Sequence, residues 1–315
     1  MLARRGASAA QALTTPLLPR PPPPLQAAHW GTPRKIAGLI PFQYVFLSRF
    51  GQALVSWFKG ALPGSAPASV AAAHAVLAPV MRPVFGVVEA LFAFQLALRG
   101  VRAPALDVVA DFYGFAMVLD TSFQEAVASG RVAVVRGEAV ALGAGGVQVA
   151  PGGGAPPTAL PCDALIAATG FRKDYAYLPP ATRAALAAGE DGLYLYRHVL
   201  PPAVPDLAFV GAEVATISNV ATHGLQAEWL ARLLAGKHAL PPREAMARAV
   251  EAHASWARSW MPATPSRASL VLLHQTHYHH ALLRDMGVPH RRKGNPLAEL
   301  FMPYRPRDYD GIVGK

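Results

Sequence analysis

The chain has 315 residues, a formal net charge of +10 and a hydrophobic fraction of 52%. This length is sufficient for two domains, and the positive charge indicates an anionic partner such as a nucleotide cofactor, a membrane surface or a nucleic acid. No aromatic–basic nucleic-acid motif occurs, so we expect no nucleic-acid partner. Cys162 is the single cysteine, which excludes an intrachain disulfide and a Cys-x-x-Cys redox pair.

The N-terminal region is strongly basic. No acidic residue precedes Glu89, and residues 1–28 contain Arg4, Arg5 and a run of four prolines. We expect a disordered leader whose composition is that of an organellar transit peptide. The alternative is a disordered proline-rich leader that contains no targeting signal. The localisation therefore stays open between an organelle, a membrane surface and the cytoplasm.

Two apolar stretches, residues 36–58 and 70–98, have the length of a membrane span. Prolines and charges interrupt both, among them Arg49 in the first and Glu89 in the second. Charges at mid-span are costly, so we expect helices that pack on a sheet or lie on a membrane surface.

The remaining elements follow from periodicity and from the position of glycine and proline. Gly130 and Gly236 are expected to end helices, Pro242 to begin one, and the glycine-rich runs at 143–146 and 152–154 to form hairpin loops. Helices are expected at 121–129, 181–188, 222–235, 242–260 and 269–286; strands are expected at 131–136, 138–142, 146–150, 163–169, 193–198 and 207–210.

Residues 163–171 read Asp-Ala-Leu-Ile-Ala-Ala-Thr-Gly-Phe. A short apolar run that ends abruptly at Thr169-Gly170 is typical of a buried parallel strand. The carboxyl end of such a strand is where open α/β sheets bind cofactors, and Gly170 would let the backbone approach a ligand closely.

A second unit lies about forty residues further on, Pro205-Asp-Leu-Ala-Phe-Val-Gly-Ala-Glu213, and a helix follows it. A strand that ends at Gly211 before a helix would direct free backbone N–H groups toward a ligand. The helix N-terminus near 219–222 adds partial positive charge. The alternative is ordinary strand–helix packing with a capping Asn or Thr.

These two units resemble the flavin-containing monooxygenases. The first is similar to the family's Asp-x-x-(I/V)-x-A-T-G-(F/Y) strand, and Leu195–Pro202, Leu207–Gly211 and Thr222–Leu230 resemble its closing segment. His29–Arg34 resembles a stretch that follows the family's NADPH fingerprint. The resemblance runs from about residue 29 to about residue 309.

The resemblance implies an α/β fold: a partial doubly wound dinucleotide-binding (FAD/NAD(P)-binding) fold with a β-meander and C-terminal helices. It implies a leader at 1–28, a partial NADPH-binding domain at 29–170, the C-terminal part of an FAD-binding domain at 171–287 and an irregular tail at 288–315.

The resemblance also implies FAD and NADPH as cofactors, with O2 and a small molecule carrying a soft nitrogen or sulfur atom as substrates. In such enzymes the flavin supplies the chemistry, and no catalytic side chain is indicated here. A helix N-terminus would stabilise the anionic edge of reduced flavin. Glu213 is a candidate ribityl ligand, and Arg34 and Lys35 follow the stretch that would hold NADPH. The implied cofactor-binding residues are Thr169, Gly170, Phe171, Gly211, Asn219 and Gln226.

The family's Gly-x-Gly-x-x-Gly turns for FAD and NADPH do not occur in these 315 residues. We therefore expect an enzyme that is incomplete in this chain, with an N-terminal partner chain as one source of the turns. The alternatives are a non-catalytic truncated remnant and a membrane-surface protein with the same partial fold.

Four histidines cluster at 274, 277, 279 and 280. Their spacing contains no His-Glu-x-x-His motif, so we expect structural or surface histidines and no metal site. His290-Arg-Arg-Lys293 is expected to be a solvated basic loop; binding of anionic lipid or a nucleotide phosphate is the alternative.

Overall fold

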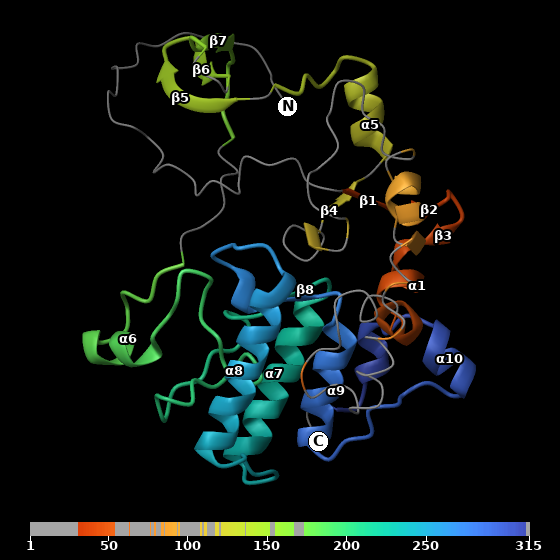
Figure 1. The fold of residues 1–315 in the computed structure, drawn as a ribbon, viewed down its shortest axis with the longest axis vertical. Helices are drawn as coiled ribbons and strands as arrows, with labels where there is room; N and C mark the ends of the chain where they lie inside the picture. Colours follow the sequence, from red (N-terminus) through yellow and green to blue (C-terminus); the bar gives the residue numbers. More distant parts are fainter. Residues whose placement is uncertain are drawn as a thin grey trace. The chain divides into compact units, whose positions relative to one another are not determined.

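The computed structural model describes residues 31–53, 117–119, 121–135, 137–151, 155–166 and 173–312, together with single positions and short runs between 63 and 111 (Figure 1). The chain divides into two compact units. One contains residues 27–124 and 176–315, and the other contains residues 125–175. We refer to the first as the helical unit and to the second as the meander unit.

The fold is mixed α/β with small sheets. In the part of the helical unit that the structure describes, there are three two-stranded sheets, two parallel and one antiparallel. They pair β1 (Gly31–Pro33) with β4 (Met117–Leu119), β2 (Lys35–Ile36) with β3 (Ile40–Pro41), and β8 (Ala215–Thr216) with β9 (Leu270–Leu272).

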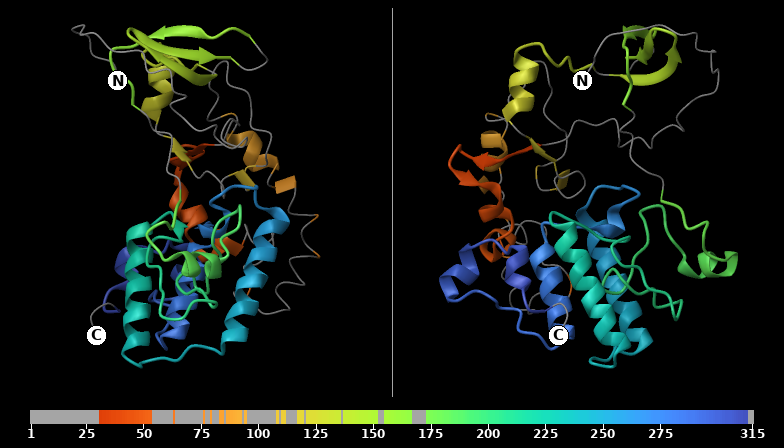
Figure 2. Two further views of the ribbon diagram at one scale, coloured as in Figure 1. Left: turned by 90° about the vertical axis from the view of Figure 1, so that its left-hand side faces the viewer. Right: turned by 180° about the vertical axis from the view of Figure 1, so that it is seen from behind.

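Helices form most of the helical unit, and α7 and α9 pack against each other (Figures 1 and 2). The helices expected at 181–188, 222–235 and 242–260 are present within three residues of those bounds. Among its described residues this unit includes α1 (Phe42–Phe46), α6 (Pro180–Leu186), α7 (Asn219–Leu234), α8 (Arg243–Trp260), α9 (Gln275–Asp285) and α10 (Pro296–Phe301), with 3-10 turns η2 (Arg267–Ser269) and η3 (Pro306–Tyr309).

The largest core cluster lies between α7, α9 and the C-terminal segment. Trp229 of α7 and Leu282 of α9 are both 0% exposed, and Tyr304 and Ile312 close the cluster from the tail. On α7 the buried positions recur every three or four residues, which is the period of a helix face. Gly236 ends this helix as predicted, with a left-handed φ of 68°.

The prediction of a strand at 163–169 is wrong for residues 163–166, which are irregular. Leu165 and Ile166 are 53% and 78% exposed. An apolar run forms a buried strand only when neighbouring strands pair with it on both sides, and no such pairing occurs here among the described residues. Residues 167–169 of that expected strand lie outside the described part of the chain.

The strands expected at 193–198 and 207–210 are also wrong. Tyr196 and Leu200 instead form an isolated antiparallel bridge across a tight turn, where Arg197 and His198 both take a φ of 53°. The backbone N–H of Phe209 donates to the carbonyl of Val199 at 2.8 Å. The aromatic and β-branched residues of these stretches therefore lie in a loop that folds back on itself, and they do not form a sheet.

The helix expected at 269–286 begins only at Gln275. The apolar residues before it form β9, which pairs in parallel with β8. The tail after Val288 is not irregular throughout, because it contains α10 and η3 and buries Tyr304, Tyr309 and Ile312.

The meander unit contains a three-stranded antiparallel sheet in the order β5 (Glu138–Gly143), β6 (Gly146–Ala150), β7 (Thr158–Pro161). The strands predicted at 138–142 and 146–150 are confirmed, whereas described residues 131–135 are irregular. Every residue of β5 is exposed, and Val147 of β6 is the one core residue in the sheet.

Helix α5 (Thr121–Ala128) confirms the helix predicted at 121–129, and Gly130 follows it with a φ of 73°.

Within the described residues, no helix is both long enough and apolar enough to cross a membrane. Of the apolar stretch 36–58, residues 36–53 are described, and they contain α1 and the helical residues 49–53. Of the stretch 70–98, the described residues include a helical run at 86–92.

Candidate functional site

The first feature of the site is the turn at Gly211, which precedes β8 and α7. Gly211 has a φ of 74°, and a Cβ at this position would lie 2.9 Å from Nδ1 of His223. Both the left-handed conformation and the close approach of the imidazole therefore require glycine here. The Gly211 N–H donates to Oε1 of Gln226 at 2.8 Å.

Gln226 is 0% exposed and uses both ends of its amide. Its Nε2 donates to the hydroxyl of Tyr278 at 2.7 Å and to the carbonyl of His198 at 3.3 Å. The Tyr278 hydroxyl then donates to the carbonyl of Arg197 at 2.7 Å. Gln226 therefore joins the Gly211 turn, the 196–200 loop and α9 in one buried network, which we call the Gln226 cluster.

Asn219 is the first residue of α7, and its side chain is turned back along the chain. Its Oδ1 accepts from the backbone N–H of Thr216 at 2.8 Å, which fixes the step from β8 into the helix. The N–H of Ser218 donates to Oε1 of Gln275 at 2.8 Å. The next backbone N–H groups have no acceptor within the helix, and Val220 is 88% exposed there. This end of α7 therefore offers main-chain donors and a positive dipole end.

A second buried chain of polar groups runs from α7 through α9 to the tail. The hydroxyl of Thr222 lies 2.7 Å from Nε2 of His279, and Nδ1 of His279 lies 2.7 Å from the hydroxyl of Tyr309. Burial lowers the pKa of His279 to about 3, so this imidazole is neutral at physiological pH. His279 thus holds α9 to its two neighbours as a hydrogen-bonding spacer.

Behind the Gln226 cluster, Arg197 forms a two-bond ion pair with Asp285. The Arg197 Nε and Nη2 atoms lie 2.7 and 2.9 Å from the two carboxylate oxygens. The indole N–H of Trp229 donates to the same carboxylate at 3.1 Å. The guanidinium charge is therefore compensated within the fold.

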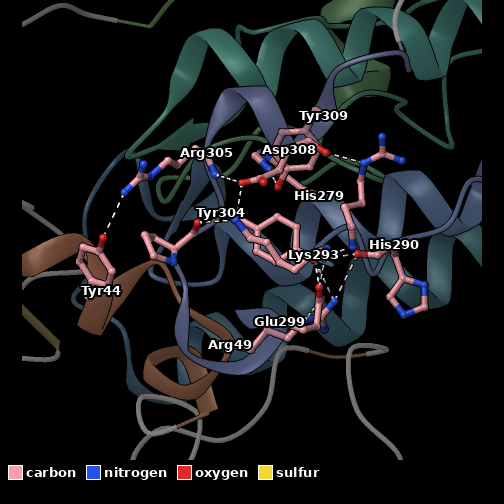
Figure 3. Close-up of polar contacts among 12 residues, drawn as sticks. Tyr44, Arg49, His279, His290, Lys293, Glu299, Tyr304, Arg305, Asp308 and Tyr309 are labelled. Carbon is pink, nitrogen blue, oxygen red and sulfur yellow. Dashed lines mark hydrogen bonds and ion pairs between the residues drawn. The ribbon is translucent and has the colours of Figure 1, made fainter. Parts of the chain in front are cut away.

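The tail is held by a further set of charged groups (Figure 3). Nε of Arg49 lies 2.5 Å from Oε1 of Glu299, which also accepts from the hydroxyl of Tyr304. Nζ of Lys293 lies 2.6 Å from Oδ2 of Asp308, and the N–H of Arg305 donates to the same oxygen. The expectation of a solvated loop at 290–293 is therefore wrong for Lys293, whose side chain is 11% exposed.

The sequence-predicted cofactor residues are placed as follows. Gly211 and Gln226 contact each other directly, and Asn219 lies at the start of the same helix. Thr169, Gly170 and Phe171 lie outside the described residues. Glu213 is 2% exposed, and its carbonyl lies 3.2 Å from Nδ1 of His198.

Sequence reasoning missed Tyr278 and Thr222 as partners of the site. The run Gln275-Thr-His-Tyr-His-His280 is polar throughout, and His279 and His280 are nevertheless 0% and 3% exposed. A polar run that a helix buries is the signal that could have indicated a hydrogen-bonding role. Within the part of the chain that the structure describes, no group of three histidine, cysteine, aspartate or glutamate side chains could hold a metal ion.

The comparison with protein families finds a match over the segment that contains the Gly211 turn. Residues 157–281 match the family model described as flavin-binding monooxygenase-like. The matched segment contains the Gly211 turn and Gln226, and it ends within α9. This segment is therefore flavin-binding monooxygenase-like, and the resemblance found in the sequence is confirmed over it.

Individual relatives agree with the family match. The chain is 33% identical over 161 residues to a probable flavin-containing monooxygenase 1 of Arabidopsis thaliana. The aligned segment covers 48% of this chain and 29% of the relative. It is 36% identical over 92 residues to a putative flavin-containing monooxygenase 2 of the same plant, covering 28% of this chain and 20% of the relative. An FAD-dependent monooxygenase rstn6 of Aspergillus nomiae is 29% identical over 132 residues, or 40% of this chain and 22% of the relative. The chain thus matches less than a third of the length of each.

Proposed function

We propose that this chain supplies the C-terminal part of a flavin-dependent monooxygenase. The complete enzyme would use FAD, NADPH and O2 to oxygenate a soft nitrogen or sulfur atom of a small molecule. The single observation that carries this proposal is the family match over residues 157–281, which includes the Gly211 turn and the helix that follows it. The parallel pairing of β8 with β9 beside α7 is consistent with an origin in a dinucleotide-binding fold.

The residues of this chain fit only part of a flavin site. The main-chain donors and the dipole at the start of α7 suit the anionic edge of a reduced flavin ring. The side chains of Gln226 and Asn219, however, are already hydrogen-bonded inside the fold, and the Gly211 N–H is used by Gln226. The flavin, when bound, would supply the redox chemistry, and this chain would orient one edge of it.

A pyrophosphate needs a cradle of backbone N–H groups, which a Gly-x-Gly-x-x-Gly turn before a helix provides. These 315 residues contain no such turn. We therefore infer that FAD is held jointly with an N-terminal polypeptide segment that carries the turn.

The rival function is a non-catalytic descendant that keeps the fold and binds no flavin. The closed hydrogen bonding of Gln226 favours this alternative, since a residue whose amide is fully used inside the protein offers nothing to a ligand. The exposed, irregular course of residues 163–166 favours it as well.

Complementation separates the two functions. We would mix the purified chain with an N-terminal portion of a flavin-containing monooxygenase chosen to contain a Gly-x-Gly-x-x-Gly turn, add FAD, remove free flavin and record the visible spectrum. Our proposal predicts that the mixture retains more flavin than the N-terminal portion by itself, and that NADPH then bleaches it. Equal retention with and without this chain would favour the non-catalytic descendant.

A further inference from the structure

A pocket of about 80 Å³ lies in the helical unit between the 196–200 loop, α8 and α9. It opens partly to solvent, and its wall combines aromatic and small apolar side chains with histidine. The residues that matter for its chemistry are Tyr196 and His198 of the loop, Val250 and His253 of α8, and Tyr278 and Ala281 of α9.

Aromatic rings surround His253. Its imidazole meets the ring of His198 edge-on at 4.9 Å between centroids and that of Tyr194 at 5.7 Å. It stacks on the indole of Trp256 at 5.9 Å, with 28° between the planes. These contacts fix the plane of the ring within the pocket wall.

His253 makes no hydrogen bond to any residue that the structure describes. Burial lowers its pKa to about 4, so at neutral pH the ring carries one N–H donor and one nitrogen acceptor and no charge. His253 is half-buried, so its nitrogens meet the solvent side of the pocket rather than a polar partner in the protein. An imidazole that lines a pocket with its nitrogens unused is therefore suited to a ligand with one hydrogen-bonding group.

The charged side chains near the pocket limit the chemical class of the ligand further. The guanidinium of Arg197 is compensated by its two-bond ion pair with Asp285. Arg284 also lines the pocket and is exposed, and its Nε donates to the carbonyl of His280 at 3.3 Å. The ring contacts and the neutral imidazole favour an uncharged planar ligand, and Arg284 makes an aromatic anion the competitor that an experiment must exclude.

The volume of the pocket sets an upper limit on the size of the ligand. A dry cavity of roughly 150 Å³ is known to hold one benzene molecule. The pocket here has about half that volume, so it admits at most a single ring, and part of that ring would stay in contact with solvent.

We propose that this pocket is a binding site for a small, uncharged, single-ring aromatic molecule that carries one hydroxyl or ring N–H, with His253 as its hydrogen-bonding partner and Tyr196 and Tyr278 as its ring contacts. The site needs no flavin, so it does not depend on the proposed monooxygenase function. It lies against the Gln226 cluster, because Tyr278 and His198 belong to both.

The test uses 4-fluorophenol as the probe, with its binding to the intact chain followed by fluorine NMR line broadening. We expect saturable binding that weakens about tenfold in His253→Phe, which keeps the ring contacts and removes both nitrogens. Arg248→Gln, on the exposed side of α8, is the matched control and should bind as the parent does. Ala249→Trp, which fills the mouth of the pocket, should abolish binding even if His253→Phe folds poorly.

Three outcomes would overturn the proposal. They are the absence of saturable binding to the parent chain, equal binding by the parent and a folded Ala249→Trp variant, and tighter binding of 4-fluorobenzoate that persists in His253→Phe. The last result would assign the pocket to aromatic anions held by Arg284. 4-Fluoroanisole, which lacks the donor, should bind about as weakly to the parent chain as 4-fluorophenol does to His253→Phe.

Discussion

The helical unit and the meander unit satisfy their polar groups in opposite ways. In the helical unit the side chains of Thr222, Gln226 and His279 are all 0% exposed. Their hydrogen bonds join α7 to α9 and α9 to the tail. In the meander unit β5 is exposed at every position, and its one polar side chain, that of Glu138, is open to solvent. A buried polar network depends on each of its members, whereas a solvated sheet does not. Substitutions of the same chemical kind should therefore have very different effects in the two units.

The largest effect is expected from Gln226→Leu. This change removes three hydrogen bonds, leaves the half-buried Gly211 N–H without its acceptor and leaves the buried Tyr278 hydroxyl without its donor, so the free energy of unfolding should fall by about 2–4 kcal/mol. Gln148→Leu in β6 is the matched control and should change it by less than about 0.5 kcal/mol. Urea denaturation followed by circular dichroism measures both, and similar losses in the two variants would contradict the contrast between the units.

Next in size is Gly211→Ala. The left-handed φ costs an alanine roughly 1–2 kcal/mol, and the new methyl group would also press on the ring of His223. Gly236→Ala has nearly the same φ with nothing within 4 Å of its Cβ, so it should show the conformational cost without the steric one. Thermal unfolding of both variants isolates the contact with His223, and equal shifts in Tm would show that this contact does not matter.

The pH dependence should come from the helical unit, because residues 125–175 contain no histidine. Burial lowers the pKa of His279 to about 3 and that of His253 to about 4. In the unfolded chain both titrate near 6.5, so unfolding takes up protons below that pH. Their contribution to stability is complete above about pH 6.5 and is lost as the pH falls toward the folded values.

Each such histidine lowers the free energy of unfolding by at most about 1.4 kcal/mol per pH unit in that window. We therefore expect Tm to fall between pH 7 and pH 5, and the fall to be shallower in His279→Gln. Tm values recorded at matched ionic strength provide the check, and a slope unchanged by the substitution would rule out the assignment to His279.

The smallest effect is expected at Asp191, whose carboxylate is held by Arg258 at 2.9 and 3.0 Å. The hydrogen bond from Arg258 lowers the pKa of Asp191 to about 2. The stability that it contributes is therefore present above about pH 4 and is lost as the pH falls toward 2. The Arg258 side chain is 48% exposed, so solvent screens this pair, and Tyr194 and Arg267 keep Asp191 hydrogen-bonded without it. Arg258→Gln should therefore cost only about 1 kcal/mol or less at neutral pH. A loss as large as that of Gln226→Leu in the same urea experiment would be evidence against this ranking.

The sequence predicted the helices of this fold better than its strands, for a physical reason. Helix α7 could be recognised from its apolar stripe and from Gly236, and α8 from Pro242, because these signals act within a few residues. The apolar runs at 163–166 and 207–210 could not be assigned in the same way, since a strand exists only where another strand pairs with it.

The arrangement of the candidate site could be predicted only in part. Gly211, Asn219 and Gln226 were expected from the resemblance to bind the cofactor, which stays a prediction, and the structure places them along one short stretch. The partner of Gln226, Tyr278, lies 52 residues further along the chain and could not be found from local patterns. That pairing holds the Gln226 amide inside the fold, where its Nε2 donates to Tyr278 and to the carbonyl of His198.

The most direct test of the account is the visible absorption spectrum of the purified chain after incubation with FAD and removal of free flavin. Since Gly211, Asn219 and Gln226 are hydrogen-bonded within the fold and no pyrophosphate turn occurs in the sequence, we predict a folded, colourless protein. A stoichiometric flavin spectrum would contradict the account, because it would mean that these residues assemble a complete FAD site by themselves.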